Sequence, residues 1–68
     1  MKSYSSMQEL QLDKGGNYTT GAKKDGKIYC VKDISGLDRT TPTGMHEIAA
    51  RKLGYEILKI ERGLYKKT

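Results

Sequence analysis

The sequence contains no phenylalanine and no tryptophan, and only twelve of its 68 residues are leucine, isoleucine or valine. Its longest uninterrupted apolar run lies at positions 28–31, far shorter than the roughly 20 residues that a membrane-spanning helix needs. About ten side chains can be well buried, which gives one small domain with little core. We therefore expect no membrane contact, and we expect a partner or a second copy, as in a homodimer, to supply further buried surface.

The sequence contains one cysteine, Cys30, and one histidine, His46. One cysteine forms no intrachain disulfide, and no apolar segment of signal-peptide length follows the first residues, so a reducing compartment, the cytoplasm, is expected. Two soft ligands cannot complete the four-ligand site of structural zinc, so we expect no metal and no cofactor. Cys30 is expected to be a buried strand residue and His46 a solvated one. Nothing positions them with an aspartate for catalysis, so no catalytic residue is assigned and no enzyme is expected.

Residues 1–16 are expected to be flexible or to form one short N-terminal element ahead of a single small domain over residues 17–68. Ser6 and Glu9 have the spacing of a capping box, and Gly15-Gly16 provides a stop, which favours a helix over residues 7–14. The alternation of polar and apolar residues over 9–13 favours a strand instead. The first five residues are expected to be loose, and the choice between helix and strand stays open.

Residues 17–35 predict a β-hairpin. Residues 18–20 are aromatic and β-branched, and residues 27–34 form the strongest strand pattern in the sequence. Between them lies Asp25-Gly26, a pair favoured in type I′ turns because both central residues need a positive φ. Lys32 interrupts the alternation of apolar residues in the second strand, so a charged residue falls on the face that would otherwise be buried.

A helix is expected over residues 42–53, because Thr41-Pro42 resembles a helix start and Gly54 a helix stop. Glu47 and Arg51 stand four residues apart on its outer side. Its buried stripe is expected to consist of the apolar residues at helical spacing, Met45, Ile48, Ala49 and Leu53.

Residues 55–61 predict a strand with apolar side chains on both faces, which is typical of a central strand or of an edge covered by a partner. A short basic tail follows over residues 63–68. The predicted fold class is therefore α+β: a β-hairpin, one amphipathic helix and a C-terminal strand, with the helix packed on a three-stranded sheet. The edge that the C-terminal strand joins stays open.

Two patterns resemble nucleotide-binding or DNA-binding motifs, and each lacks a required feature. Residues 16–23 nearly match a P-loop, yet Ala22 stands where the phosphate-binding lysine is required and Lys23 where the Mg²⁺-binding hydroxyl is required. Residues 47–54 and 59–63 resemble parts of the helix-turn-helix of phage-repressor-type DNA-binding domains. The four residues between them are too few for a turn and the start of a recognition helix. A loop entering a hairpin, and a helix followed by a strand, are the better interpretations.

Basic residues carry the remaining functional signal, since 13 Lys and Arg against 8 Asp and Glu give a net charge of +5. A hairpin with lysines at its tip can enter a nucleic-acid groove, and a nearby tyrosine can stack on bases. The alternative is a protein–protein interaction module that binds and modulates a larger host protein, because lysines also protect sheet edges and keep small proteins soluble. The type of nucleic acid stays open. The expected nucleic-acid-binding residues are Lys23, Lys24, Lys27, Tyr29, Arg51, Lys52, Lys59, Arg62, Lys66 and Lys67.

Overall fold

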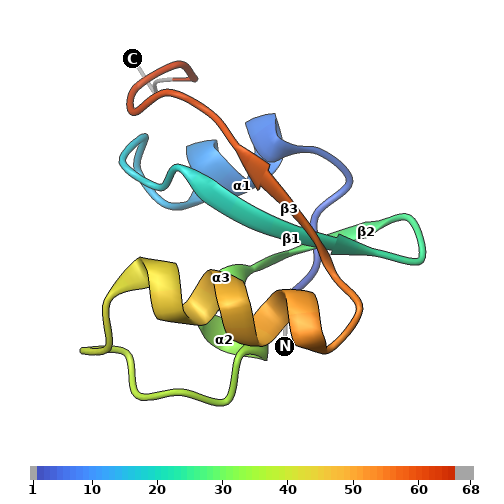
Figure 1. The fold of residues 1–68 in the computed structure, drawn as a ribbon. Coiled ribbons are helices and arrows are strands. Elements are labelled where there is room, and N and C mark those ends of the chain that lie inside the picture. Colours follow the sequence, from blue (N-terminus) through green and yellow to red (C-terminus); the bar gives the residue numbers. More distant parts are fainter. Residues whose placement is uncertain (1, 66–68) are drawn as a thin grey trace.

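The computed structural model describes residues 2–65 and shows a three-stranded antiparallel sheet with helices on both faces (Figure 1). The strand order is β2-β1-β3, so the C-terminal strand joins the free edge of the first hairpin strand, which answers a point that the sequence left open. The predicted α+β class is confirmed. The elements are α1 (Met7–Asp13), β1 (Thr20–Lys24), β2 (Lys27–Cys30), α2 (Val31–Ile34), α3 (Thr43–Lys52) and β3 (Glu56–Lys59).

The N-terminal element is a helix, the first of the two structures that the sequence allowed. The Ser6 hydroxyl accepts a hydrogen bond from the Glu9 amide at 3.2 Å, which satisfies one free N–H group of the first turn. The Glu9 carboxylate in turn accepts from the amide of Ser5 at 2.8 Å, one residue before the usual capping-box partner. Because both contacts are local, they select the helix over the strand.

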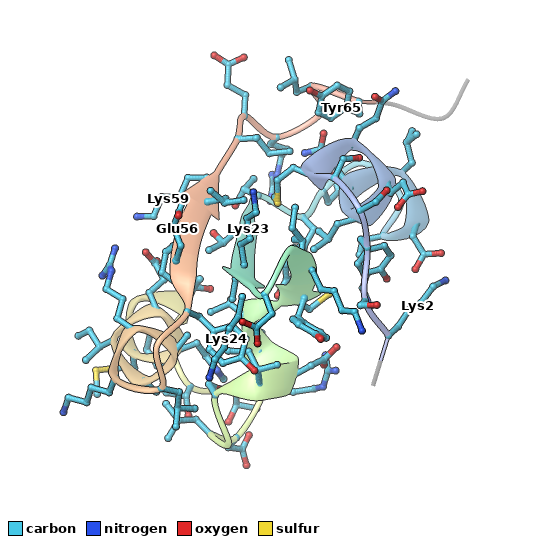
Figure 2. All side chains as sticks on the ribbon, turned by 90° about the vertical axis from the view of Figure 1, so that its right-hand side faces the viewer. Lys2, Lys23, Lys24, Glu56, Lys59 and Tyr65 are labelled. Atoms are coloured by element: carbon cyan, nitrogen blue, oxygen red, sulfur yellow. The ribbon has the colours of Figure 1, made fainter. Side chains whose placement is uncertain are left out.

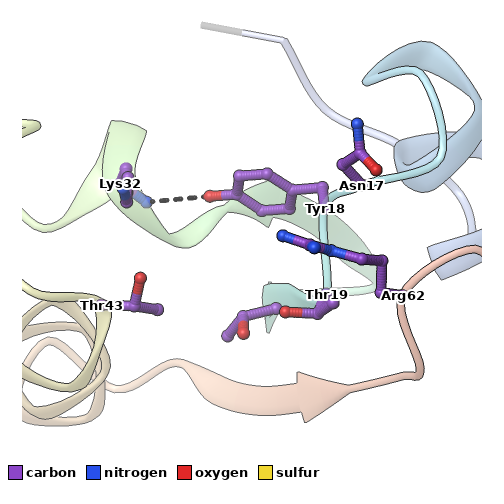
Figure 3. Close-up of a pocket in the computed structure, with 7 residues that line it drawn as sticks. Asn17, Tyr18, Thr19, Lys32, Thr43 and Arg62 are labelled. Carbon is purple, nitrogen blue, oxygen red and sulfur yellow. Dashed lines mark hydrogen bonds between the residues drawn. The ribbon is translucent and has the colours of Figure 1, made fainter.

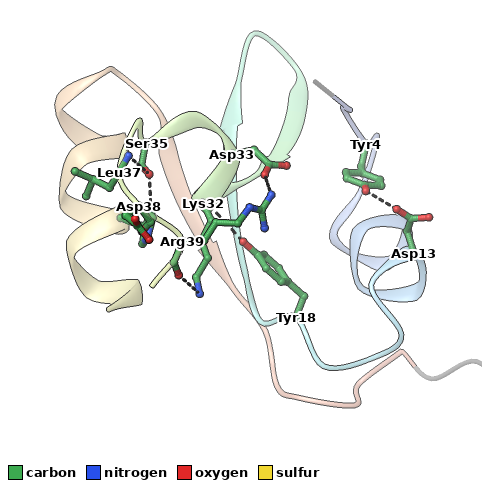
Figure 4. A network of polar contacts seen from close by, with 10 residues as sticks. Tyr4, Asp13, Tyr18, Lys32, Asp33, Ser35, Leu37, Asp38 and Arg39 are labelled. Atoms are coloured by element: carbon green, nitrogen blue, oxygen red, sulfur yellow. Dashed lines mark hydrogen bonds and ion pairs between the residues drawn. The ribbon is translucent and has the colours of Figure 1, made fainter. Parts of the chain in front are cut away.

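Tyr4 belongs to the core, although it lies in the stretch expected to be loose. Its backbone donates to and accepts from Ile28, with N···O distances of 2.7 and 2.9 Å, and so covers part of the outer edge of β2. Its ring is buried, and its phenol donates to the carboxylate of Asp13 at 2.6 Å (Figure 4). The first residues therefore tie α1 to the sheet.

The hairpin turn is confirmed at Asp25-Gly26. Asp25 has a φ of 53° and Gly26 a φ of 78°, the two positive values that a type I′ turn requires. The strands pair from Lys24 opposite Lys27 to Gly21 opposite Cys30. The turn residues therefore set the register of the whole hairpin.

The second strand is shorter than expected, because β2 ends at Cys30 and residues 31–34 form the short helix α2. In a continued strand Val31 and Ile34 would point to opposite faces of the sheet. A helical turn places residues three apart on one side, and both side chains are buried in the same cluster. The predicted strand over residues 31–34 is therefore wrong, and burial of Ile34 is the physical reason.

The helix α3 lies where it was expected, but its predicted buried stripe is wrong. Met45, Ile48 and Leu53 are exposed by 52%, 46% and 51%. The buried residues are His46, Glu47 and Ala50, and the structure therefore also corrects the prediction of a solvated His46. The face toward the sheet is selected by a small alanine and by two polar groups that find specific partners.

The core consists of two small clusters, one on each face of the sheet. Between α1 and the sheet, Leu10 of α1 packs with Tyr4, Ile28 and Cys30, and the predicted burial of Cys30 is confirmed. On the other face, Ala22, Val31, Ile34 and Ala50 join β1, α2 and α3. The edge strand β3 contributes to both clusters, since Leu58 packs against the first and Ile57 against the second. No helix among residues 2–65 is long and apolar enough to cross a membrane.

Candidate nucleic-acid interface

The three hairpin lysines are exposed around the turn. Lys24 and Lys27 are paired across the hairpin and point to the face that carries α3, whereas Lys23 points to the opposite face. Lys23 also stands opposite Glu56 in the pairing of β1 with β3 (Figure 2). The hairpin end therefore presents positive charge on both faces of the sheet.

Lys24 connects the hairpin to the C-terminal end of α3. Its ammonium group donates to the carbonyl oxygen of Leu53 at 3.1 Å and lies 5.1 Å from the ring centroid of Tyr55. A cation is favoured at a helix C-terminus, where backbone carbonyls lack intrahelical partners. Lys24 therefore has a structural role and brings the hairpin lysines close to Arg51 and Lys52.

Glu47 sits between two of the expected basic residues. Its carboxylate lies 2.8 Å from the ammonium of Lys59 and 3.8 Å from the guanidinium of Arg51. The Glu47 side chain is only 11% exposed, whereas those of Arg51 and Lys59 are 57% and 61% exposed. The carboxylate is thus covered by two cations that still present charge to solvent.

We call this surface the basic end. It brings together five of the ten expected residues from two segments of the chain, and three carboxylates lie among them, those of Asp25, Glu47 and Glu56. Five cations against three carboxylates leave a surplus of positive charge of the kind that attracts a polyanion. The basic end consists of Lys23, Lys24, Lys27, Arg51 and Lys52.

The other five expected residues lie elsewhere. Lys59 stands opposite Thr20, at the end of β1 away from the hairpin turn, and is joined to Arg51 through Glu47. Tyr29 is half-buried, and its ring packs edge-to-face on Tyr55 with a centroid separation of 6.0 Å. Arg62 follows β3 and lines a separate pocket. Lys66 and Lys67 lie outside the described residues.

Two features were missed by sequence reasoning. The first is the exposed apolar row of Met45, Ile48 and Leu53 on α3, which was assigned to the core. The second is a pocket that Lys32 shares with Arg62. The one sequence signal for this pocket is the interruption of the strand pattern at Lys32, which by itself indicates only an irregular strand.

The structure holds no arrangement typical of a metal site, because no three His, Cys, Asp or Glu side chains gather anywhere in residues 2–65. Burial raises the pKa of the Cys30 thiol, which disfavours the reactive thiolate. Comparison with protein families, curated proteins and solved structures finds no match. The function is therefore argued from the surface itself.

Proposed function

We propose that the protein is a non-enzymatic module that binds nucleic acid through phosphate contacts made by the basic end. The observation that supports this is the convergence of cations from the hairpin and from the C-terminal end of α3 on one end of the sheet. Phosphate contacts supply most of the non-specific affinity for nucleic acid and carry no sequence information. The lone cysteine, buried and without a disulfide partner, supports a place in the cytoplasm.

The contacts favour the backbone of a duplex over stacking on single-stranded bases. Stacking needs an exposed aromatic face, and Tyr29 is half-buried against Tyr55. Lys23, Lys27 and Lys52 are exposed and form no ion pair with any described residue. With one further contact from the Glu47 group, about four neutralised phosphates give a slope of log K against log salt near −3.6.

The test compares the parent with the double variant Lys23→Gln/Lys27→Gln, in which Lys24 keeps its structural contacts. We expect weaker binding to duplexes of unrelated sequence alike, and a salt slope reduced by about 1.8, since each lost contact removes about 0.9. Binding is measured by fluorescence anisotropy of labelled duplex DNA and duplex RNA over a series of salt concentrations.

The matched control is Lys2→Gln/Lys14→Gln, which removes the same charge next to α1. Lys2 makes a surface ion pair with Asp13 and a cation–π contact with the ring of Tyr4, and its side chain is 66% exposed, so its loss has little effect on stability. An equal loss of affinity in both double variants would show that net charge, rather than the basic end, drives binding. Such a result would overturn the proposed interface.

The second candidate is a protein partner, and the exposed apolar row on α3 favours it. Met45, Ile48 and Leu53 are each about half-exposed, and Arg51 and Lys52 stand beside them. A complementary partner has an apolar centre with an acidic rim. Retention of one protein after nuclease treatment, lost with Ile48→Asp and kept with Lys23→Gln/Lys27→Gln, would favour this candidate over nucleic acid.

The protein partner can also be a second copy of this chain, which would form a homodimer through Met45, Ile48 and Leu53. Pairing two copies buries the apolar side chains of α3 against each other, and it leaves the hairpin lysines free. Sedimentation equilibrium at micromolar concentration detects it, and Ile48→Asp is expected to give a monomer. A parent protein that sediments as a monomer would contradict it.

A further inference from the structure

A second polar site lies apart from the basic end. A pocket of about 280 Å³ is enclosed by the loop before β1, the start of β1, α2, the first residue of α3 and the segment after β3 (Figure 3). Of the residues that line it, only Arg62 was expected from the sequence to bind a ligand. The residues that line it are Asn17, Tyr18, Thr19, Thr20, Lys32, Thr43 and Arg62.

The charged groups of this pocket are both positive. Lys32 and Arg62 line it, and no carboxylate does. The Arg62 side chain reaches across the pocket between Tyr18 and Thr19 toward Thr43 (Figure 3). Neither cation forms an ion pair with a described residue, and the ammonium of Lys32 has one hydrogen bond, to the carbonyl of Arg39 at 3.4 Å. Two positive charges therefore remain for a ligand.

The other lining groups are neutral and can donate hydrogen bonds. Thr19, Thr20 and Thr43 contribute hydroxyls, and Asn17 contributes an amide. Burial raises the pKa of Tyr18 to about 12, so its phenol keeps its proton at neutral pH. The phenol oxygen accepts a hydrogen bond from the Lys32 amide at 3.4 Å.

The N-terminal end of α3 adds a further attraction for an anion. Thr43 is the first residue of this ten-residue helix, and Pro42 at the N-cap position provides no side-chain cap. The first N–H groups of a helix carry partial positive charge and bind anions when no cap satisfies them. The pocket thus combines two cations, several donors and an uncapped helix end.

We propose that this pocket binds a phosphate group, either inorganic phosphate or the phosphate of a small phosphomonoester. The two cations match the charge of −1.5 to −2 that such a group carries near neutral pH, and a planar guanidinium can donate two parallel hydrogen bonds to its oxygens. The volume lies just below the range of about 300–1,000 Å³ usual for small-molecule sites, so a phosphate with a small organic group fits and a large ligand does not. The site is separate from the basic end and does not depend on nucleic-acid binding.

The test is an NMR titration of the ¹⁵N-labelled full chain at constant ionic strength, with sodium phosphate in one arm and a nucleoside 5′-monophosphate in the other. We expect saturable shifts centred on the amides of residues 17–20, 43–44 and 62. Equal affinity in both arms identifies inorganic phosphate as sufficient, and tighter binding of the monophosphate identifies an organic phosphate as the ligand. The absence of saturable shifts in both arms would overturn the proposal.

Substitution separates the pocket from general charge effects. Arg62→Gln is expected to weaken phosphate binding about tenfold or more, because charge-assisted hydrogen bonds are lost. Arg62→Lys, which keeps the charge but not the planar fork, is expected to fall between that variant and the parent. Lys27→Gln removes the same charge at the hairpin and should leave phosphate binding unchanged. An equal effect of Arg62→Gln and Lys27→Gln would contradict the assignment.

The pH dependence tests the class of ligand. A phosphomonoester gains its second charge with a pKa near 6, so the affinity of the nucleoside monophosphate should rise several-fold from about pH 5.5 to about pH 7.5. Sulfate keeps its charge over this range, and its affinity should stay nearly constant. A parallel response of the monophosphate and sulfate to pH would show that the second charge of the phosphate is not recognised, and it would overturn the match between two cations and a dianion.

Discussion

At the scale of single residues, His46 shows how a polar group is accommodated in a small core. Its side chain is fully buried, and Nε2 lies 3.1 Å from the carbonyl oxygen of Asp38. A carbonyl only accepts, so Nε2 donates to it, and Nδ1 is hydrogen-bonded to the hydroxyl of Ser35. The same hydroxyl oxygen accepts from the amide of Leu37 at 3.3 Å. One serine thus connects α3 to the loop that follows α2.

Replacing Ser35 with alanine is expected to destabilise the protein by about 1–3 kcal/mol, because Nδ1 of His46 is left buried without a hydrogen-bond partner. Urea unfolding followed by circular dichroism measures the change. Ser3→Ala serves as the control, since Ser3 is exposed. Equal unfolding midpoints for the two variants would show that the buried hydrogen bond contributes nothing.

The hydrogen bond between the Tyr4 phenol and the Asp13 carboxylate makes the stability of the folded state depend on pH in the acid range. The phenol of Tyr4, and next the ammonium of Lys2, hold the pKa of Asp13 below its ordinary value. A carboxyl group with a lowered pKa stabilises the folded state above its ordinary pKa near 4, and this contribution is lost as the pH falls through the lowered value.

We expect Tyr4→Phe to raise the pKa of Asp13 toward its ordinary value and to reduce stability at neutral pH. The difference in stability between parent and variant should shrink in acid, once Asp13 is protonated in both. Carboxyl ¹³C titration measures the pKa. Glu9 is the internal control, because its lowered pKa arises from hydrogen bonds with Ser5 and should not change. An unchanged Asp13 titration would contradict the role of the phenol.

At the scale of elements, α3 shows that the apolar row of a helix need not be its buried face. Ala50 is fully buried in the cluster that contains Ala22, and two such small residues allow helix and sheet to approach closely. Glu47 turns toward the sheet because Lys59 neutralises it at 2.8 Å. Ile48 is left half-exposed on the outer side.

This arrangement predicts opposite results for two aspartate substitutions on the same helix. Ile48→Asp should leave the fold intact and change stability by less than about 1 kcal/mol, as exposed substitutions usually do. Ala50→Asp should unfold the protein, because it places an unpaired charge in a fully buried site. The dispersion of the amide NMR signals of the two variants tests this prediction. Loss of dispersion in Ile48→Asp would show that the apolar stripe expected from the sequence is the buried face of α3.

The parts of the fold that depend on local chemistry were predictable from the sequence. Asp25-Gly26 predicts the turn because few other pairs adopt two positive φ values, and Ser6 predicts the start of α1 through its own side chain. The face of α3 and the end of β2 depend on partners far along the chain, such as Lys59 for Glu47. For the same reason the sequence could list the lysines of the basic end but could not separate Arg62 from them.

At the scale of the whole molecule, Gln11 connects the first part of the chain to the last. Its side chain is fully buried in α1, and its amide nitrogen donates to the carbonyls of Tyr18 and Glu61 at 2.8 and 2.9 Å. Its amide oxygen accepts from the backbone of Tyr65 at 2.7 Å. Three backbone groups from two distant segments thus depend on one side chain. The contact joins the layer of α1 to the segment that follows β3, the strand on the far edge of the sheet.

Replacement of Gln11 should therefore weaken the whole fold rather than α1 alone. Gln11→Leu leaves two carbonyls and one N–H group, all in part-buried positions, without partners, so we expect a loss of more than about 1 kcal/mol and faster hydrogen exchange in both β1 and β3. Gln11→Glu keeps the size and the acceptor, but its carboxylate cannot donate to either carbonyl. It should be destabilised at neutral pH and partly recover in mild acid, where a protonated carboxyl regains one donor. If exchange rises in α1 while β1 and β3 stay protected, α1 unfolds separately, and Gln11 does not couple the two ends of the chain.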